Sequence, residues 1–154
     1  MSQDSTPEEK PRLSDAEMLA RFQNSKKRPP CTETLGMQLT AVNQAAMVTR
    51  FAFEARPEFA NPTGAIQGGF ICAMLDEAMS TAAIIASNVT MNAPTLEMKV
   101  SFLRPLFVGK ATGEARILKW GKSTCFIEGE IYNPEGELVA KASATQAPKP
   151  FKRF

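Results

Sequence analysis

The chain of 154 residues is 44% hydrophobic and 22% charged, and its 18 Lys and Arg against 16 Asp and Glu give a net charge of +2. These values favour one globular domain, and a charge this small gives no sign of a nucleic-acid partner. No run of 18 apolar residues predicts a membrane-spanning helix, and the polar N-terminus lacks the apolar segment of a secretory signal, so we expect a cytoplasmic protein without a membrane partner.

The N-terminal region begins with a polar segment and continues into a short helix. Residues 1–13 predict a disordered tail, because they are polar and hold two prolines. Ser14 and Glu17 match a capping box, which predicts a helix over about 14–24. Prolines cannot continue a helix, so the pair at 29–30 marks its latest end.

The middle of the chain changes its hydrophobic period. Between Gln67 and Ser87 apolar residues recur every three and four residues, which predicts a long helix that is buried on most sides. Such a helix would be about 30 Å long, so we expect it to run through the centre of the domain. Two strand-like segments precede it and four follow it, with a turn sequence at 133–136 that indicates an antiparallel meander. The strand-like segments lie within 34–42, 45–55, 96–104, 113–120, 124–132 and 137–146.

This order of elements predicts an α+β fold, in which one curved antiparallel sheet wraps around the long central helix. We place the single domain at 14–148, with the short helix at its N-terminal end. We expect residues 149–154 to form a basic C-terminal tail.

The chain contains no histidine, which excludes Ser-His-Asp triads, Cys-His dyads and His-ligated zinc sites. Its three cysteines, Cys31, Cys72 and Cys125, form no CxxC pair, which excludes zinc-ribbon and thioredoxin-like sites and fits reduced thiols. We therefore expect neither a metal nor a cofactor. Acid–base chemistry would have to use a carboxylate, Lys, Tyr, Cys or bound water.

The start of the long helix combines two glycines with an acid two turns later. Gly68 and Gly69 lie where the first helical N–H groups have no intrahelical partner, so one of them could donate to a thioester carbonyl. The glycines also fit a simple turn before a core helix. Asp76 lies among apolar residues and shares a helix side with Cys72 and Ser80, which fits either a catalytic carboxylate or a solvated flank of the helix.

The segment NPTGAIQGGFICAMLD, from Asn61 to Asp76, resembles the signature of hotdog-fold acyl-CoA thioesterases, in the phenylacetyl-CoA thioesterase-like group. That group usually has an Asn, a Gly and His-Gly-Gly, with an acid eight residues after the first Gly of the pair. Gly68 and Asp76 keep this spacing, whereas Gln67 replaces the usual His. The resemblance covers about residues 35–147 and extends the predicted architecture to a hotdog fold.

The resemblance also implies catalytic roles. Asp76 would act as general base on water or as nucleophile on the thioester carbonyl, and the Gly68 N–H would polarise that carbonyl. Asn61 would position the water or the acid. A hydroxyl near the acid would come from Thr95 or from Ser80, and the sequence does not decide between them.

Further residues are predicted to contact the substrate. Two of them are basic, as the phosphates of coenzyme A require. The same residues also fit core packing or a solvated surface. The predicted set consists of Gln67, Gly69, Phe70, Met79, Arg104 and Lys122.

The implied activity is hydrolysis of an acyl- or aryl-acyl-CoA thioester. The family places its active site at a dimer interface, with the glycine end and the acid from different subunits, which implies a homodimer or a dimer of dimers. Because Gln67 departs from the pattern, the alternative is a hotdog module that binds acyl-CoA without hydrolysing it.

Overall fold

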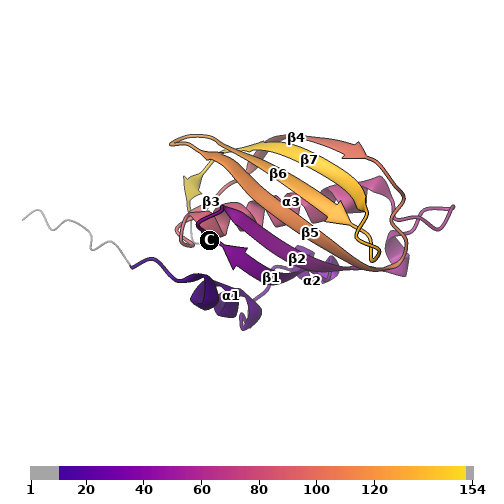
Figure 1. Ribbon diagram of the computed structural model, residues 1–154, viewed down its shortest axis with the longest axis horizontal. Coiled ribbons are helices and arrows are strands. Elements are labelled where there is room, and N and C mark those ends of the chain that lie inside the picture. Colours follow the sequence, from indigo (N-terminus) through magenta and orange to yellow (C-terminus); the bar gives the residue numbers. More distant parts are fainter. Residues whose placement is uncertain (1–10, 152–154) are drawn as a thin grey trace, which may run out of the picture.

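One antiparallel sheet curves around the long helix α3 in the computed structural model, which describes residues 11–151 (Figure 1). The predicted α+β hotdog architecture is therefore confirmed. Residues 1–10 of the predicted N-terminal tail and 152–154 of the predicted basic tail lie outside the described residues. The helices are α1 (Asp15–Gln23), α2 (Pro30–Thr34), the 3-10 helix η1 (Pro57–Phe59) and α3 (Gly68–Ala86); the strands are β1 (Gln38–Asn43), β2 (Val48–Ala55), β3 (Met91–Asn92), β4 (Thr95–Phe102), β5 (Gly109–Trp120), β6 (Cys125–Tyr132), β7 (Leu138–Gln146) and β8 (Lys149–Pro150).

The N-terminal helix has the predicted capping box. The Ser14 hydroxyl accepts a hydrogen bond from the Glu17 N–H, and the Glu17 carboxylate accepts one from the Ser14 N–H at 2.8 Å. As predicted, α1 ends before the two prolines, and Pro30 opens the additional short helix α2. Proline suits the first turn of a helix, where its missing N–H would have no intrahelical partner.

The strand order corrects the predicted meander. Within the described residues the sheet runs β1-β2-β5-β6-β7-β4, so only β5, β6 and β7 follow one another as a meander. The chain leaves β2, passes through α3 and enters the sheet again at the far edge. There Thr95 of β4 pairs with Gln146 of β7, and Phe102 pairs with Ala140. Strand β4 is consequently an edge strand, not the neighbour of β5.

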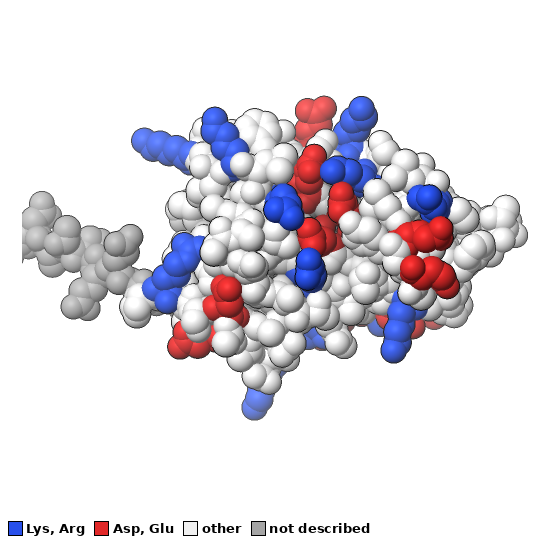
Figure 2. All heavy atoms as spheres, in the orientation of Figure 1, with Lys and Arg blue, Asp and Glu red and all other residues white. Residues whose placement is uncertain are grey.

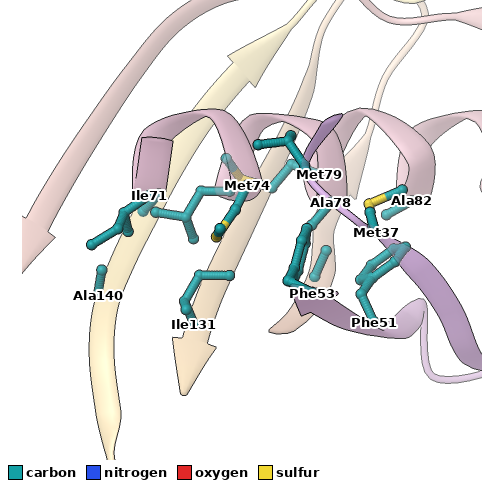
Figure 3. Packing of buried hydrophobic residues seen from close by; sticks show 14 of the residues in the cluster. Met37, Phe51, Phe53, Ile71, Met74, Ala78, Met79, Ala82, Ile131 and Ala140 are labelled. Carbon is teal, nitrogen blue, oxygen red and sulfur yellow. The ribbon is translucent and has the colours of Figure 1, made fainter. Parts of the chain in front are cut away.

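The core lies between α3 and the concave face of the sheet. Figure 3 shows Met74 and Ala78 of α3 facing Phe53 of β2 and Ile131 of β6, and all four side chains are buried. The helix approaches β6 closely at Gly129, where an added Cβ would lie 3.0 Å from the Met79 Cγ. This apolar contact fixes which face of α3 turns away from the sheet.

Helix α3 is, within residues 11–151, the helix that is long and apolar enough to cross a membrane by length and composition. Its position explains this composition, because the sheet wraps around it and buries most of its apolar side chains. Burial in a protein core favours the same residues as a membrane does.

The predicted basic C-terminal tail is partly structured. Lys149 and Pro150 form strand β8, which pairs with Asn92 and Met91 of β3. The boundary at residue 148 therefore lies too early, because a two-residue strand gives no periodic signal in the sequence.

The convex face of the sheet carries interleaved charges, which Figure 2 shows gathered near its centre. Lys141 of β7 lies 3.1 and 3.2 Å from the carboxylates of Glu128 and Glu130 on β6. Glu130 also accepts a hydrogen bond from Tyr132, which raises the pKa of Tyr132 to about 12. These charged groups pair with one another across the strands, as on a solvated sheet face.

Candidate active site

Asp76 lies half-buried on α3, on a side that faces the beginning of β4. The Thr95 hydroxyl donates a hydrogen bond to Asp76 Oδ1 over 2.6 Å. Strand β4 thus supplies a partner that lies 19 residues further along the chain. A hydroxyl–carboxylate bond of this length is short and charge-assisted.

A third residue joins this pair. Gln146, at the end of β7, is wholly buried, and its Nε2 donates to the Thr95 Oγ1 at 3.1 Å and to the Ser80 Oγ at 3.2 Å. Thr95 and Ser80, between which the sequence did not decide, therefore belong to one network. We call Asp76, Thr95, Gln146 and Ser80 the polar cluster.

Sequence reasoning missed Gln146, although a signal was present. In β7 the residues that face α3 are Ala140, Ala142 and Ala144, and the next residue in that alternation is Gln146. A polar side chain at a core position needs hydrogen-bond partners there. An amide that ends a row of buried alanines therefore indicates a polar site.

The other described ionisable groups near the polar cluster make no hydrogen bond to Asp76. Burial raises the pKa of the Cys72 thiol on α3 and of the Cys125 thiol on β6, so both stay neutral near pH 7. Glu77, the next residue on α3 after Asp76, is half-buried and accepts a hydrogen bond from the Thr32 hydroxyl, while the Cys31 Sγ lies 3.8 Å from it. Glu77 thereby ties α2 to α3 instead of joining Asp76.

The other end of the candidate site is the N-terminus of α3. Among residues 11–151, the N–H groups of Gly68 and Gly69 donate to no protein acceptor, as expected for the first turn of a helix. The adjoining backbone is fixed by two bonds: the Gln67 N–H donates to the Phe59 carbonyl at 2.8 Å, and the Ile66 N–H donates to the Leu106 carbonyl at 2.7 Å. The exposed Gln67 side chain makes no capping hydrogen bond.

Asn61 shapes the turn that precedes α3. Its Oδ1 accepts hydrogen bonds from the Thr63 N–H at 2.9 Å and the Thr63 hydroxyl at 2.7 Å. The Asn61 N–H donates to the Ala65 carbonyl at 2.7 Å. Within the described part of this chain, Asn61 therefore contacts its own turn and makes no hydrogen bond to Asp76.

An open groove of about 390 Å³ lies beside the N-terminus of α3. Gly68, Ile71, Phe102 and Arg104 are among its lining residues. A Cβ added to Gly68 would lie 3.2 Å from the tip of the Phe102 ring, so the glycine allows this aromatic side chain to approach the helix end. The groove provides an apolar wall next to two unpaired backbone donors.

The residues predicted to contact substrate lie in different environments. Met79 is wholly buried against Gly129, so the prediction that it lines a substrate site is corrected to a core position. Phe70 is half-buried and stacks on Phe59, with ring centroids 4.1 Å apart. The groove is bordered instead by the exposed ring of Phe102.

The two basic candidates lie at opposite ends of the sheet. Arg104 follows β4 at the Gly68 groove, where its Nη1 donates to the Leu138 carbonyl and its Nε lies 3.6 Å from Glu137. Lys122 is exposed in the turn between β5 and β6, and the adjoining Cys125 pairs with Gln146 of the polar cluster. Arg104 thus lies at the Gly68 groove, whereas Lys122 lies in the turn at the other end of the sheet.

The comparisons with known proteins agree on one family. The family model described as the thioesterase superfamily matches residues 63–140, which include both ends of α3. The chain belongs to the thioesterase superfamily. The resemblance to hotdog-fold thioesterases is thereby confirmed, and membership supports a thioester hydrolase.

Individual relatives extend this result. A candidate thioesterase of Ralstonia eutropha JMP134, a phenylacetic acid degradation-related protein, is 32% identical with a TM-score of 0.78, over 84% of this chain and 98% of that one. The PaaI protein from the phenylacetic acid degradation operon of E. coli shares the fold, with 22% identity and a TM-score of 0.68 over 76% and 86% of the two chains. A candidate esterase of Saccharolobus solfataricus is 33% identical over 56% of this chain, and the chain spans only 61% of that curated relative.

Proposed function

We propose that the protein hydrolyses the thioester of an acyl- or aryl-acyl-CoA in the cytoplasm, with Asp76 as general base or nucleophile. The observation that carries the proposal is the Thr95 hydroxyl on Asp76 Oδ1, within a superfamily of thioesterases. This bond holds the carboxylate in one orientation. Among the described residues Asp76 Oδ2 has no hydrogen-bond partner, so this oxygen is available for the reaction.

The chemistry requires a base or nucleophile and a donor to the carbonyl oxygen. As a base, Asp76 removes a proton from water while the water oxygen attacks the thioester carbon; the C–S bond then breaks, and the departing thiolate takes up a proton. As a nucleophile, Asp76 attacks the thioester carbon, the C–S bond breaks and the departing thiolate takes up a proton, and water hydrolyses the resulting mixed anhydride in a second step. In both routes the Gly68 N–H stabilises the negative charge that develops on the carbonyl oxygen.

Distance along α3 supports a site that two subunits share. Gly68 and Asp76 are eight residues apart in one helix, which corresponds to about 12 Å along its axis. One thioester carbonyl cannot contact both groups of the same chain. We therefore assign the acid and the glycine to different protomers of a homodimer or a dimer of dimers.

Strand β4 offers a surface for that self-association. It is an edge strand, and edge strands carry unpaired backbone groups that can bond to another strand. Its ends expose Leu96 by 64% and Phe102 by 52%, and Phe107 beyond it is 59% exposed. This combination of a free edge and apolar side chains fits pairing with a second copy of the chain.

The test is a thiol-release assay over a panel of aliphatic and aryl-acyl-CoA thioesters, with Asp76→Asn as the matched variant. We expect release of free coenzyme A by the parent and its loss in the variant, with the fold and the oligomeric state unchanged. Equal turnover by Asp76→Asn would contradict the assignment of Asp76. No release from any thioester would contradict hydrolysis itself.

The exposed Gln67 supports a second candidate, a module that binds acyl-CoA without hydrolysing it. The groove and the two unpaired N–H groups at the start of α3 would serve binding alone as well as catalysis. Saturable binding measured by calorimetry, with no thiol released over the panel, would favour this module.

A further inference from the structure

The buried Gln146 side chain makes hydrogen bonds that simple core packing does not require. It is wholly buried at the end of β7, and both of its recorded hydrogen bonds are donated by Nε2. Its Oε1 is buried and, within residues 11–151, has no hydrogen-bond partner. An unpaired buried acceptor works against folding, so an apolar residue of similar size would serve the core better.

The direction of the hydrogen bonds shows how Gln146 affects the Thr95 hydroxyl. A side-chain NH₂ group only donates, and a hydroxyl has a single proton. Because the Thr95 oxygen accepts from Gln146, the Thr95 proton is directed to Asp76 Oδ1 at 2.6 Å. The same NH₂ group also donates a hydrogen bond to the Ser80 oxygen.

We propose that Gln146 is a positioning residue, which orients the Thr95 hydroxyl so that it donates to Asp76 Oδ1 and leaves Oδ2 for the reaction. This inference rests on the proposed thioester hydrolysis. Gln146 itself acts through Thr95 and is not a catalytic residue. Its effect belongs to the turnover step, not to substrate affinity.

Neutral side chains, not charged ones, hold the Asp76 carboxylate in its orientation. On α3 the titratable neighbours are Cys72, a neutral thiol, and Glu77, which bonds to Thr32. On β6 the titratable residue that pairs with Gln146 is the buried Cys125. Glu97 and Lys99 of β4 are exposed, and their partners in register, Thr145 and Ser143, lie on the convex face. Within the described chain, no charged side chain makes a hydrogen bond to Asp76.

Two variants distinguish a positioning role of Gln146 from a role in core packing alone. Gln146→Met keeps the size and removes the donor, and Gln146→Glu keeps the shape but replaces the donor with an acceptor. We expect Gln146→Met to lower kcat by about tenfold with an unchanged KM, and Gln146→Glu to lower it further, because its carboxylate would draw the Thr95 proton away from Asp76.

A double-mutant cycle tests the path of the effect. Adding Gln146→Met to Thr95→Val should lower kcat no further than Thr95→Val alone, because residues that act as a unit are not additive. Thr49→Val, which removes a buried hydroxyl of β2 outside the polar cluster, is the control and should keep the parental kcat. We expect Gln146→Met to melt no lower than the parent. Multiplicative losses, or a parental kcat with a lowered melting temperature, would overturn the proposal in favour of plain packing.

A readout without turnover keeps the two proposals apart. A crystal structure of Gln146→Met shows the position of the Thr95 hydroxyl whether or not the protein hydrolyses a thioester. A Thr95 hydroxyl that has lost its hydrogen bond to Asp76 Oδ1 supports the positioning role, and a Thr95 hydroxyl that keeps this bond at the parental 2.6 Å overturns it. If the parent releases no thiol, the proposed hydrolysis fails, while the crystal structure still decides whether Gln146 directs the Thr95 hydroxyl.

Discussion

The two ends of the candidate site differ in what holds them in place. At the start of α3, backbone hydrogen bonds from Gln67 and Ile66 fix the chain, and the groups offered to a ligand are backbone N–H groups. Two turns later, Asp76 depends on side chains from three elements, α3, β4 and β7. The first end is open and the second is half-buried.

This difference teaches which substitutions each end tolerates. A backbone donor needs a helix start but no particular neighbouring side chain, which explains how Gln67 can stand where the family usually has His. The exposed Gln67 side chain makes no capping bond, and the main-chain bond from Gln67 to Phe59 remains. The acid end has no such freedom, because hydrogen bonds link Asp76, Thr95, Gln146 and Ser80 to one another.

The largest expected effect comes from disabling the acid in one subunit and the glycine donor in the other. Asp76→Asn and Gly68→Pro should each lower kcat about 10²- to 10⁴-fold in the pure protein, as is typical for losing a general base or an oxyanion donor. Refolding the two variants together should restore roughly a quarter of the parental sites, since half of the random dimers carry one intact pair. The thiol-release assay on the mixture measures this, and a mixture as inactive as its components would contradict a shared site.

A sharper test isolates the backbone donor at Gly68. Proline is tolerated at the first helical position, and the preceding residue, Gln67, already has the extended conformation that proline requires, with ψ at 134°. Gly68→Pro should therefore remove one N–H, keep the helix and lower kcat about 10²-fold. Gly68→Ala is the matched control, because it keeps the N–H and meets the same Phe102 ring. Equal losses in both variants would indicate that the ring contact matters, not the donor.

A smaller effect distinguishes the two hydroxyls of the polar cluster. Thr95→Val removes the bond to Asp76 and should lower kcat by about tenfold, whereas Ser80→Ala removes only an acceptor of Gln146 and should cost about twofold. Steady-state kinetics on the best thioester of the panel compares them. The reverse order would make Ser80 the hydroxyl that serves the acid.

The smallest expected effect lies at Gln67. Gln67→Ala should change kcat/KM by less than about twofold, because an exposed side chain without a capping bond adds little to the helix start. Gln67→His, which restores the family pattern, should likewise leave the rate near the parental value. A tenfold gain in either variant would show that this side chain controls the Gly68 N–H after all.

The sequence by itself determined the elements with strong local signals. The capping box of Ser14 and Glu17 predicted α1, the period between Gln67 and Ser87 predicted α3, and alternation predicted the strands of the sheet. The family spacing singled out Gly68, Asp76 and the hydroxyl pair. The helix predictions succeed because caps and periodicity depend on residues that are close in the chain.

Only the tertiary structure decided what depends on distant pairing. The position of β4 beside β7, instead of beside β5, brings Thr95 and Gln146 together, although they are 51 residues apart. The same packing placed Met79 in the core and tied Glu77 to α2. Sheet order is set by which strands bury the faces of α3 together, and no local pattern in the sequence records that choice.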